Sequence, residues 1–246
     1  MSKFDQIEVD IKQKAIRFRI DNGFSNTEPI RLKSLLLKCN VLTIFRPLSD
    51  NFSGMAIKIN DDRFMLVNCE HNLGKQHFTI AHELYHLFIQ ENFTAKQCVT
   101  GKFDKNDIEE YKADLFSSYF LLPEDGLVIN IPSPDQGKDK IKLESILKLE
   151  QYYSISRRAL LQRLKNIGLI TSAIYDRYAV DVRKSANAFG YGTDLYANGN
   201  TNVIIGDYGV RANHLFNEER ISESHYLELM RTIGFDPLEN GILDNE

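Results

Sequence analysis

Apolar and polar residues alternate along the first half of the chain in a way that predicts helices around a few short strands. Ile7, Ile11, Ala15 and Phe18 recur at helical spacing in the opening segment. Pro123 is expected to end the last helix of this half. The expected helices cover residues 5–22, 30–38, 75–90 and 107–122, and the expected strands cover 41–45, 54–59 and 63–68. Helices beside a small sheet are typical of an α+β fold.

The second half of the chain has a weaker pattern. Residues 124–140 are rich in Pro, Gly, Asp and Lys, and we predict a linker or lid there. Residues 171–209 have mixed strand and loop character. Further helices are expected over residues 141–151, 156–166 and 210–233, with Gly168 capping the second of them and a break near residues 220–222.

Composition and charge limit the class of protein. A hydrophobic content of 43% and a charged content of 26% are ordinary for a soluble globular protein, and the net charge of −4 gives no sign of nucleic-acid or membrane binding. No apolar run approaches the roughly 20 residues of a membrane span, and the charged N-terminus lacks the apolar segment of a signal peptide. Cys39, Cys69 and Cys98 are odd in number and widely spaced, so we expect reduced thiols in a cytoplasmic protein.

The most informative chemistry lies in the apolar segment from Phe78 to Phe88, which contains the motif His82-Glu83-x-x-His86. Positions four apart lie on one helix face with Cβ atoms about 5–6 Å apart, so the two histidines can bind one Zn²⁺. Glu83 lies beside them and can reach a zinc-bound water as a general base. The alternative is a buried helix with structural histidines, but each buried polar group would then need its own partner.

Such a zinc site needs a third protein ligand. The helix predicted from Asp107 offers Glu109 and Glu110, and we favour Glu110 because Asp114 follows one turn later on the same face. One carboxylate could then bind the metal while the other accepts a hydrogen bond from a ligating histidine. Asp107 followed by Glu110 also fits a helix N-cap with a capping-box glutamate, which would leave Glu110 a structural residue.

These motifs resemble those of the ImmA/IrrE family of metallopeptidases, which is similar to the gluzincins. The resemblance is clearest between residues 67 and 123. Two positions depart from the usual family pattern, because Tyr85 replaces a glycine and Ser117 replaces an alanine. The matching residues are Asn68, the run 78–86, Glu110-x-x-Ala113-Asp114-x-Phe116 and Leu121-Leu122-Pro123.

The resemblance implies a zincin-like metallopeptidase domain with a small sheet and a His-Glu-x-x-His helix. In that domain His82, His86 and Glu110 would bind Zn²⁺, Glu83 would be catalytic, and Asp114 would support a ligating histidine. A segment that ends at Gly168-Leu169-Ile170 is similar to the helix-turn-helix-like part of the family. The expected regions are 1–130 for the peptidase domain, 131–175 for the helical region and 176–246 for a C-terminal region of open function.

The family resemblance also implies a substrate. Such enzymes cleave a transcriptional repressor at a specific site, commonly one with a helix-turn-helix domain, and they often belong to mobile elements or stress responses. Glu83 would take a proton from a zinc-bound water and deliver it to the leaving amine. The sequence singles out no residue that would stabilise the oxyanion.

Two other functions remain open at this stage. The protein could be a DNA-binding regulator with a structural zinc, for which Arg157, Arg158, Arg163 and Lys165 would supply a basic helix face. The same residues also fit the solvated face of an ordinary amphipathic helix. A third hypothesis is a module that sequesters a partner without cutting it, as in a toxin–antitoxin pair.

Overall fold

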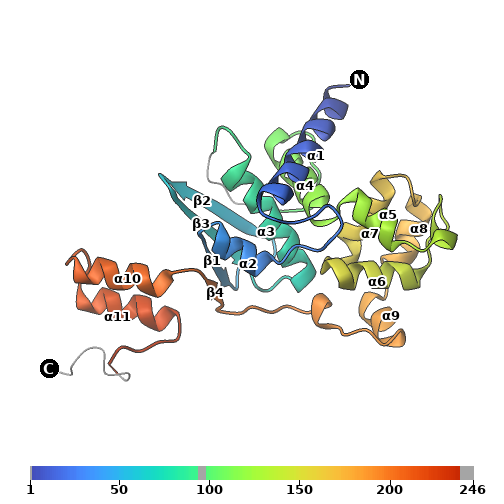
Figure 1. Cartoon of the computed structure of the whole chain (residues 1–246). Helices are drawn as coiled ribbons and strands as arrows, with labels where there is room; N and C mark the ends of the chain where they lie inside the picture. The colour runs from blue at the N-terminus through green and yellow to red at the C-terminus, as the bar shows by residue number, and fades with distance from the viewer. Residues whose placement is uncertain (1, 94–97, 239–246) are drawn as a thin grey trace.

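A computed structural model describes residues 2–93 and 98–238, and Figure 1 shows helices packed around a small sheet. The strands are β1 (Val41–Arg46), β2 (Gly54–Ile59), β3 (Asp62–Asn68) and β4 (Ile204–Ile205). The α-helices are α1 (Lys3–Asp21), α2 (Leu32–Lys38), α3 (Leu73–Phe88), α4 (Ile108–Leu121), α5 (Glu124–Asn130), α6 (Leu143–Tyr153), α7 (Arg157–Asn166), α8 (Ser172–Tyr178), α9 (Val182–Ala188), α10 (Tyr208–Asn217) and α11 (Glu223–Thr232), with short 3₁₀ turns at Ser133–Asp135 and Asp194–Tyr196. The α+β class is confirmed.

The sheet is mixed, with strand order β2-β3-β1-β4. β1 pairs with β3 in parallel, whereas β2 and β3 form an antiparallel hairpin and β4 adds antiparallel to β1. β2 is therefore an edge strand, and α3 packs against β2 and β3. This packing brings the His-Glu-x-x-His helix directly beneath the edge of the sheet.

Helices α1, α3 and α4 form the packing that supports the site. α1 begins with a capping box at Ser2, and its apolar periodicity buries Ile11 and Ala15 completely. The ring of Phe18 contacts Phe116 and Phe120 of α4, at centroid distances of 5.8 and 5.5 Å. α4 in turn packs against α3. The histidine helix is thus held between the sheet and a two-helix support.

The prediction of a linker or lid over residues 124–140 is wrong. Residues Glu124–Asn130 form α5, and Leu127 and Ile131 are buried in the main hydrophobic core. Because polar residues and glycines surround Leu127 and Ile131 in this stretch, the sequence showed no apolar pattern there. The prediction of strand character over residues 171–209 is also largely wrong, because the structure has the short helices α8 and α9 there.

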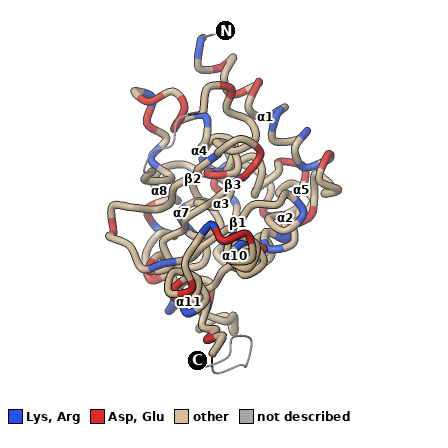
Figure 2. Tube along the Cα trace, turned by 90° about the vertical axis from the view of Figure 1, so that its left-hand side faces the viewer, with Lys and Arg blue, Asp and Glu red and all other residues tan. Residues whose placement is uncertain are grey.

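The predicted basic face of α7 is wrong as well, because two of its four members point into the protein. Arg157 is buried against Glu150, and Arg163 is buried with its guanidinium 4.5 Å from the ring centroid of Tyr119. Only Arg158 and Lys165 of that set are exposed. Figure 2 shows basic and acidic residues interspersed along the trace. The observation that supported a DNA-binding regulator is therefore lost.

The main hydrophobic core continues across residue 130, because one cluster includes Leu84 of α3, Leu149 of α6 and Leu161 of α7. A second, small cluster of Ala212, Tyr226 and Met230 joins α10 to α11, which Figure 1 shows at the opposite end from α5–α8. The division into three regions stays a prediction, and its last part, 239–246, lies outside the described residues. No helix in the described ranges is long and apolar enough to cross a membrane.

The buried Arg157–Glu150 pair yields a stability prediction. Replacing Arg157 with alanine leaves the Glu150 carboxylate buried without its partner, so the free energy of unfolding should fall by about 3–5 kcal/mol. Arg158→Ala removes the adjacent, exposed arginine and should change it by no more than about 0.5 kcal/mol. Urea denaturation of both variants measures the difference. Equal losses would contradict a specific contribution from the buried pair.

Candidate metal centre

Two helix starts fix the positions of the candidate ligands. Asn72 caps α3, its side chain accepting a hydrogen bond from the backbone N–H of Lys75, and α3 is then buried on most of its sides. Asp107 caps α4 through the backbone N–H of Glu110. Both caps satisfy N–H groups that would otherwise lack partners at a helix start. The two helices pack together, so residues near the middle of α3 face residues near the start of α4.

The two motif histidines and Glu110 converge on one point. His82 Nε2 lies 3.2 Å from His86 Nε2 and 3.1 Å from a carboxylate oxygen of Glu110, while His86 Nε2 lies 3.5 Å from the other oxygen. Donors at about 2.0–2.1 Å from a tetrahedral zinc are about 3.3 Å apart. The spacing of the three donors therefore fits one zinc ion.

The second nitrogen of each histidine has its own partner. His82 Nδ1 lies 2.9 Å from an oxygen of Asp114, and His86 Nδ1 lies 2.6 Å from the side-chain oxygen of Gln90. Because both partners are acceptors, each Nδ1 donates a hydrogen and each Nε2 is the nitrogen left to bind a proton or a metal ion. These two nitrogens and a carboxylate face one another, an arrangement that a cation stabilises.

Asp114 is itself held by the loop that precedes α4. The backbone N–H groups of Gly101 and Phe103 each donate a 2.8 Å hydrogen bond to its two oxygens. Burial lowers the pKa of His82, but hydrogen bonds with Asp114, Cys98 and Glu110 outweigh burial and raise that pKa well above its usual value. The environment of His82 thus favours a positive charge, and either a proton or a metal ion can supply that charge.

Glu110 rather than Glu109 faces the histidines. The Glu109 carboxylate accepts hydrogen bonds from Tyr85 Oη at 2.8 Å and Lys112 Nζ at 2.6 Å, which turn it away from the site. Asp107 caps the helix in the way that the alternative interpretation required. The cap uses only the backbone of Glu110, so the carboxylate of Glu110 can still face the histidines.

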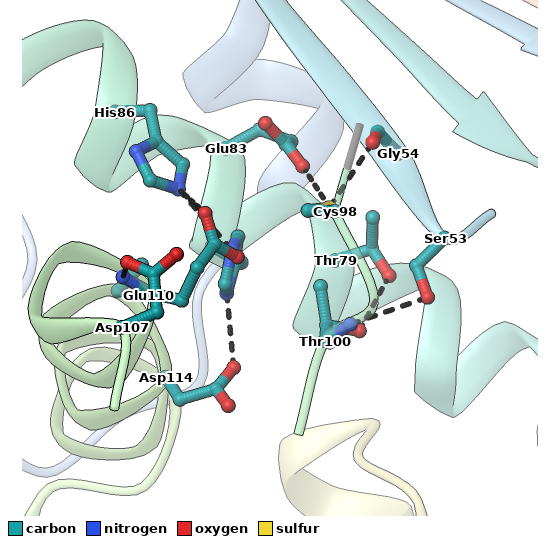
Figure 3. Close-up of polar contacts among 12 residues, drawn as sticks. Ser53, Gly54, Thr79, Glu83, His86, Cys98, Thr100, Asp107, Glu110 and Asp114 are labelled. Atoms are coloured by element: carbon teal, nitrogen blue, oxygen red, sulfur yellow. Dashed lines mark hydrogen bonds and ion pairs between the residues drawn. The ribbon is translucent and has the colours of Figure 1, made fainter. Parts of the chain in front are cut away.

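Glu83 is also buried, and its carboxylate points toward Cys98 and Gly54 at the edge of the sheet (Figure 3), while it stays within 4.8 Å of a ring nitrogen of His82. One of its carboxylate oxygens accepts a hydrogen bond from the thiol of Cys98 at 2.6 Å. A Cβ at Gly54, the first residue of β2, would lie 3.1 Å from the same oxygen. Burial raises the pKa of Glu83 to about 7, so this carboxyl can take up and release a proton near neutral pH.

Cys98 is a site residue that the sequence did not point to. Its backbone pairs with Gly54 of β2, and its thiol reaches Glu83, so that His82, Glu83 and Cys98 form a second possible metal cluster. Burial and the nearby carboxylate of Glu83 raise the pKa of the Cys98 thiol to about 12, which disfavours the thiolate that a metal needs. The histidine–Glu110 set is therefore the better metal centre.

Gln90 is the other residue that sequence reasoning missed. It follows His86 by four positions and lies just beyond the end of α3 at Phe88, a spacing that the expected helix over residues 75–90 would have placed on the same face. The contact of Cys98 with Glu83 had no such signal, since it depends on a backbone bridge between segments 44 residues apart in the chain. The five residues predicted from the sequence, Glu83, His82, His86, Glu110 and Asp114, all lie together at the junction of α3 and α4.

Comparison with known proteins identifies a family for the part of the chain that contains these residues. The model of the Peptidase M78 family, described as an IrrE N-terminal-like domain, matches residues 38–165. A solved structure, a Mycobacterium tuberculosis transcriptional regulator, is 14% identical with a TM-score of 0.43, and the alignment covers 67% of this chain and 52% of that one. The chain thus spans about half the length of that regulator, which is too distant to assign a function. Among curated proteins there is no match.

The family match runs from the last residue of α2 through β1–β3, α3 and α4 into α7. It includes His82, His86 and Glu110 as well as Glu83 and Asp114. More than half of the chain lies within it. The chain therefore belongs to the Peptidase M78 family, whose defining segment is an IrrE N-terminal-like domain.

Proposed function

We propose that this protein is a zinc-dependent endopeptidase that cleaves a helix-turn-helix transcriptional repressor at a specific site. The observation that carries the proposal is the convergence of two histidine lone pairs and a carboxylate beside a buried glutamate whose pKa is near neutral. Membership of a peptidase family supports the reaction class. The choice of a repressor as substrate rests on the family resemblance alone.

His82, His86 and Glu110 would hold the zinc ion. When bound, zinc supplies a Lewis acid that activates water and polarises the scissile carbonyl. Asp114 keeps the hydrogen of His82 on Nδ1 and fixes the orientation of the ring. Gln90 has the same effect on His86.

Glu83 would serve as the general base. It is 1% exposed, and its environment holds its pKa far above that of an ordinary glutamate. It would accept a proton from the attacking water and donate that proton to the amine that leaves. Cys98 and Gly54 restrict the position of this carboxylate, the first by a hydrogen bond and the second by close packing.

The edge strand β2 offers a way to hold a peptide. β2 is hydrogen-bonded to β3 on one side, and beyond the Gly54–Cys98 bridge no described strand pairs with its other side. An extended substrate could add to that edge through main-chain hydrogen bonds. Because α3 packs against β2, a chain bound there would pass close to Glu83.

The proposed ligand set predicts which glutamate controls zinc binding. Loss of a residue that only supports a metal ligand lowers metal affinity by about 10–100-fold. Glu110→Ala removes a ligand itself, so it should lower zinc affinity by more than that. Glu109→Ala should leave zinc affinity unchanged, because Glu109 bonds to Tyr85 and Lys112 instead. Competition with a chromophoric chelator measures both variants. Full zinc affinity in Glu110→Ala would move the third ligand elsewhere.

The proposed reaction is tested on a helix-turn-helix repressor encoded next to the gene of this protein. The zinc-loaded protein should cut it at one site, as intact mass spectrometry would show, and a chelator should abolish the products. Glu83→Gln should retain zinc but cut about 10²–10⁴-fold more slowly, because it lacks the base.

Two results would contradict the peptidase. Unchanged cleavage by Glu83→Gln would exclude the general-base role. A stable complex with the repressor that forms equally well with Glu83→Gln and yields no products would instead indicate a partner-sequestering module.

A further inference from the structure

A cavity of about 550 Å³ lies beside the N-terminal half of α3, next to the loop whose backbone holds Asp114. Phe78 and Lys75 of α3 line one wall, and they precede His82 by four and seven residues. Residues at these spacings share a helix face, so the cavity lies along the face of α3 that carries the zinc ligand, toward the start of the helix. Its volume is in the range of about 300–1,000 Å³ that is usual for ligand pockets.

The loop that holds Asp114 forms another part of the lining. Thr100, Gly101 and Phe103 line the cavity, and the latter two donate the backbone hydrogen bonds to Asp114. The rings of Phe78 and Phe103 lie 6.4 Å apart, centroid to centroid. An occupant would therefore contact the same loop that orients His82.

The cavity is basic although the whole chain is acidic. Arg158 and Arg183, from the starts of α7 and α9, line it together with Lys75, and none of the described lining residues is acidic. Both arginines are exposed, and within the described residues neither forms an ion pair. The neighbouring Arg157 is already paired with Glu150. Two available guanidinium groups favour carboxylates as ligands.

The position of the cavity indicates which carboxylates would reach it. Lys75 precedes His82 by seven residues, which corresponds to about 10 Å along the helix at 1.5 Å per residue. An extended peptide covers that distance in about three residues at 3.3 Å each. A chain that is cut beside Glu83 would thus place a side chain about three positions away in the cavity.

We propose that this cavity binds acidic side chains of the polypeptide substrate, so that the peptidase prefers Asp or Glu two to four residues from the scissile bond. The proposal rests on the proposed function, because it assumes a peptide that crosses the metal centre. The aromatic rings of Phe78 and Phe103 would pack against the aliphatic part of the bound side chain.

Binding is tested apart from cleavage, on the full-length Glu83→Gln protein with zinc. The probe is a fluorescein-labelled peptide rich in glutamate, and its control has lysine in place of glutamate. The glutamate peptide should bind and the lysine peptide should not. Arg158→Glu with Arg183→Glu should weaken binding about tenfold or more, because charge-assisted hydrogen bonds are lost and repulsion is added.

The matched control replaces two exposed basic residues outside the cavity, Arg177→Glu with Lys33→Glu, and carries the same change in net charge. It should bind the glutamate peptide within about twofold of the parent, since distant charges are screened by salt. Equal affinity of the parent for both peptides, or equal weakening by both double variants, would overturn the proposal. Displacement of the peptide by micromolar inorganic phosphate would assign the cavity to a small anion instead.

A cleavage assay separates this proposal from the proposed function. The zinc-loaded wild-type protein is given a synthetic peptide library in which aspartate, alanine or lysine is fixed at each position in turn. A preference for aspartate near the cleavage site, lost in the Arg158/Arg183 double variant, supports both proposals. Cleavage without that preference supports the proposed peptidase activity and contradicts the proposal that the cavity binds acidic side chains. Binding of the glutamate peptide with no cleavage of any library member keeps the pocket as an acidic-peptide site and contradicts the peptidase.

Discussion

The hydrogen bonds of the Asp114 carboxylate are the interaction on which the rest of the site depends. Asp114 accepts from two backbone N–H groups of the loop before α4 and from Nδ1 of His82 on α3. It therefore joins two helices and a loop at one buried point. Because the carboxylate fixes the hydrogen of His82 on Nδ1, the Nε2 lone pair faces His86 and Glu110. Without this bond the hydrogen would no longer be held on Nδ1, and Nε2 would lose its assignment as the metal-binding nitrogen.

Two acidic residues close to each other have different chemistry because their surroundings differ. Glu110 lies in the first turn of α4, keeps some contact with solvent and faces the histidines, which suits a metal ligand. Glu83 is enclosed by α3, β2 and Cys98, and burial raises its pKa to about 7. Carboxyl groups in different surroundings commonly divide ligand and acid–base functions between them.

Sequence patterns predicted the elements that carry long apolar faces or clear end signals, such as α4 between Asp107 and Pro123. They failed for α8 and α9, which have seven residues each and bury only Ile174 and Ala186, so that no apolar helix face shows in the sequence. Spacing left both Glu109 and Glu110 open, because the choice depends on how α4 is rotated against α3 and on the hydroxyl of Tyr85. The burial of Arg157 also depends on tertiary packing, since Glu150 lies on a different helix.

We propose that zinc binds to two histidines and Glu110, with Glu83 and Cys98 outside its coordination sphere. X-ray absorption spectroscopy at the zinc edge of the loaded protein tests this most directly. We predict nitrogen and oxygen neighbours at about 2.0–2.1 Å, with the multiple-scattering pattern of two imidazoles. A sulfur neighbour at about 2.3 Å would place zinc on Cys98 and contradict the ligand set of His82, His86 and Glu110.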